Sequence, residues 1–239
     1  IMLPVMVCMD GFILTHGMET VDIPAQDKVD KFLPAYKSLY KLDPAEPLSM
    51  GLLVDPDYYM ETRFTIQETL KDTLNFIPKA SEEFRSVFGR DYKDCLIEEY
   101  RSKDADKVIV AMGSVCGTIK EVVDELRAKG KKVGLLKIIS YRPFPYAKVY
   151  EALKLVSKVA VLDKAVSLGA QAPLAIEIKA AFCGKKKSPL VISSFVAGLG
   201  GRDITGDSIK EIFRKLNTKE VNGEFIDLKP ELLREQYGG

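Results

Sequence analysis

Residues 107–139 read KVIVAMGSVCGTIKEVVDELRAKGKKVGLLKII, and this stretch decides the fold. Residues 107–112 and 133–139 are short runs of branched apolar side chains, typical of strands buried on both faces of a sheet. Between them, TIKE at 118–121 fits a capping box, and Gly130 stands where a helix would end. Apolar residues recur there at helical spacing: Ile119, Val122, Val123 and Leu126. The stretch therefore predicts a strand, a helix and a second strand in succession.

The same alternation continues to Leu216. We expect strands over 159–162 and 189–193, a helix starting at Pro145 and another over 172–181. Thr205 is expected to cap a last helix, whose apolar face would consist of Ile209, Ile212, Phe213 and Leu216. Repeated strand–helix units with short connections predict an α/β domain over residues 105–216, in which helices sandwich a mainly parallel sheet.

The remaining parts of the chain are less regular. Residues 1–20 contain an apolar run, 2–7, that predicts a strand already under way, so we expect the end of another domain in a processed or cut chain. Residues 21–104 are too rich in aromatic side chains for a solvated linker, and we expect this connecting segment to wrap across another surface. Residues 217–239 are polar and are expected to form an extended tail that docks elsewhere.

Prolines interrupt the connecting segment 21–104. A proline inside a helix removes a hydrogen bond, so the spacing of these residues argues against long uninterrupted helices. We expect one amphipathic helix near residues 62–76 and a charged helix near residues 81–101. The prolines are Pro24, Pro34, Pro44, Pro47, Pro56 and Pro78.

Composition argues against several classes of protein. The 239 residues include 35 basic and 34 acidic side chains, and a net charge of +1 gives no general attraction to nucleic acids. With 46% hydrophobic and 29% charged residues, the chain is typical of folded globular proteins. The apolar runs are too short to span a bilayer, and no signal peptide is visible at the start of the sequence.

Few residues could support metal or nucleophile chemistry. No two cysteines have C-x-x-C spacing and there is one histidine, His16, which argues against a zinc site or an iron–sulfur cluster in this chain. We expect four mostly buried free thiols in a reducing compartment. For His16, a hydrogen-bonded loop histidine beside Asp10 and Thr15 is favoured over a general base. The cysteines are Cys8, Cys95, Cys116 and Cys183.

Three loops should meet at the carboxyl edge of the predicted sheet, where open parallel sheets usually bind ligands. They are residues 113–118, 163–169 and 198–203, and each contains glycine. Any of them could cradle an anion, but none matches a dinucleotide fingerprint or a phosphate-binding loop, and tight turns need glycine in any case. The loop YRPFP at 141–145 is either a rigid turn or an anion clamp built on Arg142, and the rigid turn is favoured.

Five motifs, in one collinear order, resemble the pyruvate:ferredoxin oxidoreductases, which belong to the thiamine-dependent 2-oxoacid:ferredoxin oxidoreductases. VMVCMDGF at 5–12, followed by Thr15 and His16, is similar to the end of the family's thiamine-pyrimidine domain. The others resemble its next domain, of the transketolase C-terminal type: AMGS at 111–114, GKKVGLLK at 130–137, YRPFP at 141–145 and GLGGRDIT at 198–205. The resemblance covers nearly the whole chain and implies the C-terminal part of an alpha subunit of a pyruvate synthase.

The resemblance implies an oxidoreductase that converts pyruvate, coenzyme A and oxidised ferredoxin into acetyl-CoA, CO2 and reduced ferredoxin in anaerobic, cytoplasmic metabolism. Thiamine diphosphate, Mg2+ and iron–sulfur clusters would serve the assembled complex. This chain alone is expected to bind none of them and to be inactive, since the thiamine-activating carboxylate lies in the N-terminal part of the alpha subunit. No catalytic residue and no metal ligand is therefore assigned here.

The resemblance also implies partners: the N-terminal part of alpha, the beta, gamma and delta or ferredoxin-like subunits, and ferredoxin, but no nucleic acid and no membrane. The portion present here would mainly assemble subunits. Two alternatives stay open. One is the corresponding subunit of a 2-oxoglutarate or branched-chain 2-oxoacid:ferredoxin oxidoreductase, and the other is a non-catalytic assembly module.

One site expectation concerns the loop 198–203. Backbone N–H groups near Gly200 and Gly201, the dipole of the following helix and the guanidinium of Arg202 would together favour an anion. We expect a carboxylate from a neighbouring subunit, with a phosphate of coenzyme A as the second candidate. Alternatively, Arg202 pairs with Asp203 or lies in solvent, where it contributes little.

Overall fold

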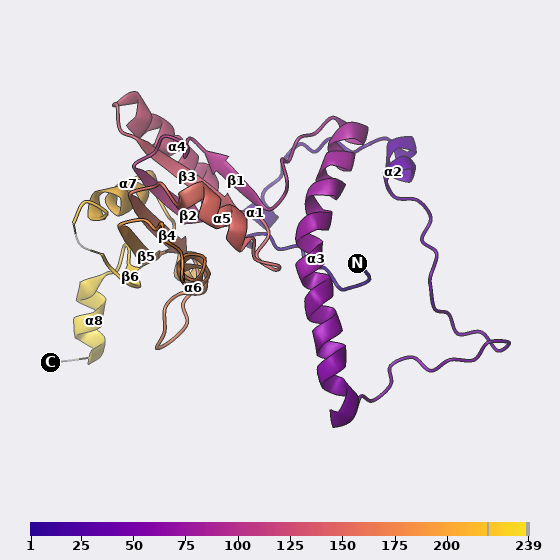
Figure 1. Ribbon diagram of the computed structural model, residues 1–239. Coiled ribbons are helices and arrows are strands. Elements are labelled where there is room, and N and C mark those ends of the chain that lie inside the picture. The colour runs from indigo at the N-terminus through magenta and orange to yellow at the C-terminus, as the bar shows by residue number, and fades with distance from the viewer. Residues whose placement is uncertain (219, 238–239) are drawn as a thin grey trace. The chain divides into compact units, whose positions relative to one another are not determined.

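The computed structural model describes residues 1–218 and 220–237 of the chain (Figure 1). These residues form two compact units. The first consists of residues 1–8 and 12–95, and the second consists of residues 9–11 together with those from Leu96 onward. Residues 9–11 therefore belong to the second unit although residues of the first unit flank them in the sequence.

A six-stranded sheet organises the second unit, with the spatial order β1-β3-β2-β4-β5-β6. Only β1 is antiparallel to its neighbour, and the other pairs are parallel. The mainly parallel α/β sheet expected from the sequence is confirmed. The strands are β1 (Ile97–Tyr100), β2 (Lys107–Ala111), β3 (Val133–Ile138), β4 (Lys158–Asp163), β5 (Val191–Val196) and β6 (Glu224–Phe225).

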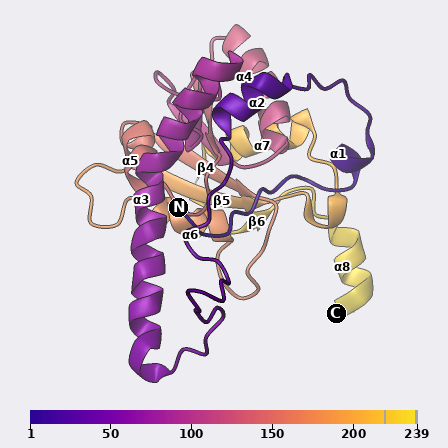
Figure 2. The ribbon, with the colours of Figure 1, turned by 90° about the vertical axis from the view of Figure 1, so that its right-hand side faces the viewer.

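Helices cover both faces of this sheet (Figure 2). Helices α4 (Val115–Ala128) and α7 (Gly206–Lys215) pack on one face, whereas α5 (Tyr146–Leu153) and α6 (Pro173–Ala180) pack on the other. Successive residues of β2 alternate between the two cores, so that Ile109 contributes to the first and Val108 and Val110 contribute to the second. All three side chains are fully buried, and each such burial stabilises the fold by about 1.5–3 kcal/mol.

The ends of the helices confirm some of the predicted caps and correct one. Thr205 caps α7 through a reciprocal pair of hydrogen bonds with Ser208, and Gly130 follows α4 with a φ of +74°. The capping box at 118–121 is wrong, because α4 already begins at Val115. Val115 and the adjacent Cys116 are buried in the core, and this packing extends the helix toward its amino terminus.

The first unit contains the short helices α1 (Ile13–His16) and α2 (Gln26–Phe32) and the long helix α3 (Pro56–Phe88). The prediction of two separate helices is wrong, because α3 runs without a break through Pro78. Aromatic contacts of Phe84 and Phe88 with Phe32 stabilise the turns that follow this proline. The helix ends at Gly89, which has a φ of +73°. Part of the predicted second helix instead forms β1.

Both ends of the chain differ from expectation. Residues 2–7 form no strand, and Val5, Met6 and Val7 are exposed, because no other described strand pairs with them. The predicted extended tail is also wrong: β6 pairs with β5, and α8 (Pro230–Tyr237) follows, while residues 219, 238 and 239 lie outside the described residues. Among the described helices, none combines the length and apolar character that crossing a membrane requires.

Candidate functional site

The crevice between the carboxyl ends of β2 and β4 is the point where the strand order reverses. From β2 the chain moves to β3 on one side, and it later returns to place β4 on the other side. The loop after β2 leads into α4 on one face of the sheet, and the loop after β4 leads toward α6 on the opposite face. Such a switch point is where open α/β sheets bind their ligands.

The side chain of Asp10 occupies this crevice. Its Oδ2 accepts a hydrogen bond of 2.6 Å from the backbone N–H of Ser114, and its Oδ1 lies 3.1 Å from Nζ of Lys164. Gly113 makes this approach possible, since a Cβ there would lie 2.8 Å from Oδ2, and its φ is +75°. Two loops that the sequence places at this edge are thus joined by a third segment.

Electrostatics keep the Asp10 carboxylate charged. Hydrogen bonds from the hydroxyl and the backbone N–H of Ser114, with a smaller contribution from Lys164, lower its pKa to about 2. The amino terminus of α4 adds a favourable dipole. Asp10 therefore fills the anion position that the sequence assigned to the loop 113–118.

A second carboxylate at this edge has a structural role. Asp163, the last residue of β4, is buried, and it accepts hydrogen bonds of 3.0 and 3.2 Å from the backbone N–H groups of Leu174 and Ala175. Burial is the main influence on its pKa, which is raised. The carboxylate fastens the start of α6 to the end of β4. Sequence reasoning missed this cap because Asp163 and α6 are separated by an irregular loop.

The third loop, 198–203, is fastened to the C-terminal segment. Nη1 of Arg202 donates a 2.6 Å hydrogen bond to the carbonyl oxygen of Asp227, and the carboxylate of Asp227 accepts one from Ser208. Gly200 and Gly201 adopt positive φ and have open space where a Cβ would be. The anion contact predicted for Gly200, Gly201 and Arg202 stays a prediction.

The loop 141–145 is held by ionic and aromatic contacts. The guanidinium of Arg142 lies over the ring of Tyr141 and donates a 2.6 Å hydrogen bond to Glu177 of α6. The hydroxyl of Tyr146 also contacts the carboxylate of Glu177, and this hydrogen bond raises the tyrosine's pKa. With its guanidinium engaged by Glu177, Arg142 matches the rigid turn better than the anion clamp.

His16 ends the short helix α1. Its Nδ1 lies 2.6 Å from the carbonyl oxygen of Phe12 and 3.4 Å from Oγ1 of Thr15. The histidine is thus hydrogen-bonded locally, as expected, although it lies in a helix and not in a loop. The hydrogen-bond partners that the structure describes for this ring, Phe12 and Thr15, are not acidic and so do not supply the carboxylate of a catalytic triad.

The thiols differ from expectation. Only Cys116 is buried, whereas Cys8 and Cys183 are exposed and Cys95 is intermediate, so the prediction of mostly buried cysteines is wrong. Burial raises the pKa of Cys116 to about 11, which leaves it a protonated, unreactive thiol at neutral pH. Among the side chains that the structure describes, those of residues 1–218 and 220–233, no three His, Cys, Asp or Glu groups gather as a metal site would require.

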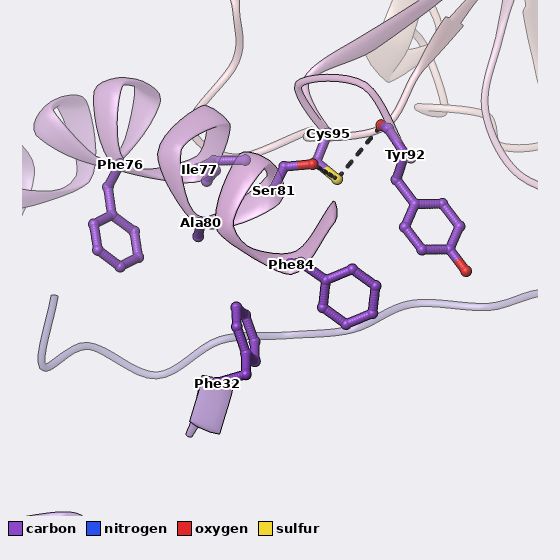
Figure 3. A pocket seen from close by; sticks show the side chains of 8 residues that line it. All are labelled: Phe32, Phe76, Ile77, Ala80, Ser81, Phe84, Tyr92 and Cys95. Carbon is purple, nitrogen blue, oxygen red and sulfur yellow. Dashed lines mark hydrogen bonds between the residues drawn. The ribbon is translucent and has the colours of Figure 1, made fainter. Parts of the chain in front are cut away.

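An apolar pocket of about 390 Å³ lies in the first unit (Figure 3). Two of its polar side chains are hydrogen-bonded: Oγ of Ser81 donates to the carbonyl oxygen of Lys93 at 2.6 Å, and the Cys95 thiol lies 3.3 Å from the same Oγ. The pocket fits an apolar group and carries no basic side chain. Its lining consists of Phe32, Phe76, Ile77, Ala80, Ser81, Phe84, Tyr92 and Cys95.

Comparison with known proteins identifies the family of the chain. Residues 105–209 match the family model described as pyruvate:ferredoxin oxidoreductase core domain II. Residues 1–82 match the model described as the thiamine diphosphate-binding domain of pyruvate flavodoxin/ferredoxin oxidoreductase. The chain belongs to the pyruvate:ferredoxin oxidoreductase family. Strands β2 to β5 of the second unit thus lie in the part that matches core domain II, whereas the edge strands β1 and β6 lie outside it.

Two curated relatives illustrate the range of this family. Pyruvate synthase subunit PorA of Methanothermobacter thermautotrophicus is 48% identical over 231 residues, which cover 97% of this chain and 58% of the relative. Ketoisovalerate oxidoreductase subunit VorA of Pyrococcus horikoshii is 39% identical over 223 residues, which cover 93% of this chain and 56% of the relative. The chain therefore spans less than two thirds of the length of each relative.

Among solved structures, the chain is similar to the 2-oxoglutarate:ferredoxin oxidoreductase from Magnetococcus marinus with 2-oxoglutarate, coenzyme A and succinyl-CoA bound. The TM-score is 0.41 at 20% identity, over 59% of this chain and 22% of that chain.

Proposed function

We propose that this chain is the C-terminal part of the alpha subunit of a pyruvate synthase. The assembled enzyme would oxidise pyruvate with coenzyme A and ferredoxin to acetyl-CoA and CO2 in the cytoplasm. The observation that carries the proposal is the 48% identity to a pyruvate synthase subunit along 97% of the chain. The collinear motifs at 5–12, 111–114 and 198–205 support it.

Within that enzyme, we propose that this portion assembles subunits and does not contact the reacting atoms. The crevice that would receive a ligand in an open α/β sheet already holds the carboxylate of Asp10, which would repel a pyrophosphate or a 2-oxoacid. The apolar pocket lacks a basic group for a pyrophosphate. The described residues therefore do not fit thiamine diphosphate at either place.

Mg2+ and iron–sulfur clusters would likewise be held by other chains of the complex. Among the side chains that the structure describes, no group of three or more cysteines, histidines or carboxylates gathers to hold a metal ion. Thiamine diphosphate would supply the decarboxylation chemistry in the assembled enzyme. The domain limits that accompany this proposal are 1–20 and 21–104 for the end of the pyrimidine domain and its connecting segment, 105–216 for the α/β domain and 217–239 for the tail.

A second candidate is the alpha subunit of a branched-chain 2-oxoacid oxidoreductase. The 39% identity to a ketoisovalerate oxidoreductase subunit supports this candidate, but it is lower than the identity to the pyruvate synthase subunit. Substrate choice therefore has to be measured directly. A non-catalytic module outside any oxidoreductase would show no activity with any of the 2-oxoacids.

A chimera tests the proposal. In the Methanothermobacter thermautotrophicus subunit, the matching C-terminal stretch would be replaced by this chain, and the chimera would be assembled with the other subunits of that enzyme. Reduction of a viologen dye would be followed with pyruvate, 2-oxoglutarate or ketoisovalerate under anaerobic conditions. We expect coenzyme A-dependent activity with pyruvate. An assembled chimera that uses only another 2-oxoacid, or none, would contradict the proposal.

A further inference from the structure

The amino-terminal edge of the parallel strands carries a cluster of lysines, at the opposite end of the sheet from Asp10. Lys107 is the first residue of β2 and Lys158 the first residue of β4, and the two are directly opposite each other in the sheet register. Lys131 lies in the turn that precedes β3. Three lysines, at or just before the starts of β2, β3 and β4, are thus placed at the same edge of the sheet.

Mutual repulsion within this cluster is evident at Lys107. Its pKa is lowered, first by burial and then by the positive charges of Lys158 and Lys131. The ammonium of Lys107 contacts the neutral side chain of Asn217, and Asp106 offsets only part of the repulsion. Like charges directly opposite each other destabilise a sheet, so the fold itself gains nothing from this arrangement.

A basic loop extends the same edge. Lys185, Lys186 and Lys187 precede β5, and all three are exposed. The ammonium of Lys185 lies 5.1 Å from the centre of the Tyr150 ring. For Lys186, Lys187 and Lys131, no ion pair is found with any other residue that the structure describes.

Two exposed leucines are close in sequence to these lysines, Leu155 shortly before Lys158 and Leu190 shortly after Lys187. Leu155 is 77% exposed and Leu190 is 82% exposed. The backbone N–H of Leu190 donates a 2.9 Å hydrogen bond to the carbonyl oxygen of Ser157, which places Leu190 beside the segment that follows Leu155. Exposed apolar side chains next to mainly basic ones fit the composition of a protein interface, which has an apolar centre and a polar rim.

We propose that this lysine edge, defined as Lys107, Lys131, Lys158, Lys186 and Lys187 with Leu155 and Leu190, is a docking surface for an acidic protein. Carboxylates of the partner would neutralise the lysines and accelerate association, and its apolar groups would cover the leucines. A nucleic acid fits less well, since the net charge of the chain is only +1 and the leucines offer nothing to phosphates.

Binding of fluorescent poly-L-glutamate to the full chain, followed by anisotropy at low and physiological salt, tests this inference. The edge variant K131E/K186E/K187E reverses three exposed charges. The control variant K28E/K37E/K79E makes the same change in net charge on exposed lysines of the first unit. We expect the Kd to rise at least about ten-fold in the edge variant and less than about two-fold in the control, because local charge and not net charge determines docking.

Additional variants and ligands test which class of partner binds. Far-UV circular dichroism would verify folding, and K131Q/K186Q/K187Q would replace the edge variant if charge reversal prevents folding. Leu190→Ser should weaken binding of an acidic polypeptide that also carries leucine residues, without changing the salt dependence. Equal losses in edge and control variants would overturn the proposal. Tighter binding of duplex DNA than of polyglutamate, through the same lysines, would also overturn it. Because these assays measure binding and not turnover, they can fail while the proposed enzyme function stands.

Discussion

At the scale of single residues, the position of Asp10 shows how a loop without regular structure can be fixed. Its carboxylate lies on the amino terminus of α4 and beside Lys164, and it excludes any side chain at position 113. Both partners are more than a hundred residues away along the sequence. Charge and hydrogen bonding, with little apolar burial, therefore hold residues 9–11 in the second unit.

Replacing Asp10 by Asn should destabilise the second unit by about 1 kcal/mol, because the charge that pairs with Lys164 and the α4 dipole is lost. The pKa of Asp10 is lowered to about 2 in the folded chain, below the ordinary value of 3.8. Its contribution is therefore fully present above about pH 4 and is lost as the pH falls toward 2.

Urea unfolding followed by circular dichroism at pH 7 and pH 3 measures this contribution. The difference in the free energy of unfolding between the wild type and Asp10→Asn should be smaller at pH 3 than at pH 7. The control is Asp207→Asn, which changes a nearly fully exposed carboxylate of the same unit. A difference in unfolding free energy that grows on acidification would contradict the stabilising role of the charged Asp10 carboxylate.

Replacement by alanine should have opposite effects on stability at Gly134 and at Gly117. In β3, a Cβ at Gly134 would lie 2.6 Å from the carbonyl oxygen of Arg101, so Gly134→Ala should cost about 3 kcal/mol or more. In α4, nothing lies within 4 Å of a Cβ at Gly117, so Gly117→Ala should stabilise by about 0.5 kcal/mol through helix propensity. Calorimetric melting of the two variants compares them, and a neutral Gly134→Ala would show that β1 can move away.

At the scale of elements, α3 departs furthest from its sequence pattern. The proline spacing predicts interrupted helices, yet the helix continues from Pro56 to Phe88. Pro56 lies in the first turn, where its missing N–H costs nothing, but Pro78 lies inside the helix. Packing of Phe84 and Phe88 on Phe32 offsets the penalty. Tertiary contacts therefore outweigh local preference in this element.

Pro78→Ala should raise the stability of the first unit by up to about 3 kcal/mol, because alanine restores a helical hydrogen bond and removes a clash. Pro56→Ala should change it by less than about 0.5 kcal/mol. Helix content from far-UV circular dichroism and the midpoint of unfolding would be measured for both variants. A loss of stability in Pro78→Ala would mean that the proline ring itself contributes packing.

At the scale of the whole molecule, the chain divides into a helical unit and a sheet-based unit with different kinds of core. The second unit buries two continuous apolar clusters, one on each face of its sheet. In the first unit many large apolar side chains are exposed, among them Tyr58, Met60 and Phe64 of α3. Stability should therefore be concentrated in the second unit.

A fragment starting at Leu96 should unfold in one cooperative transition, whereas the full chain should unfold in two. A fragment limited to residues 105–216 should be less stable, because it lacks β1 and β6 at the two edges of the sheet. Scanning calorimetry and circular dichroism would compare the full chain with the two fragments. Circular dichroism takes the place of tryptophan fluorescence because the chain has no tryptophan. A fragment from Leu96 that binds hydrophobic dyes and melts without cooperativity would contradict this assignment.

The sequence alone determined the alternation of β2, α4, β3, α5, β4, α6, β5 and α7, because apolar periodicity, caps and glycines are local signals. It also identified the loops 113–118 and 163–169 as neighbours at one edge. Only the tertiary structure decided which anion lies between them, how the edge strands β1 and β6 attach, and that α3 passes through Pro78. Those features depend on contacts between residues distant in the chain, and periodicity carries no information about such partners.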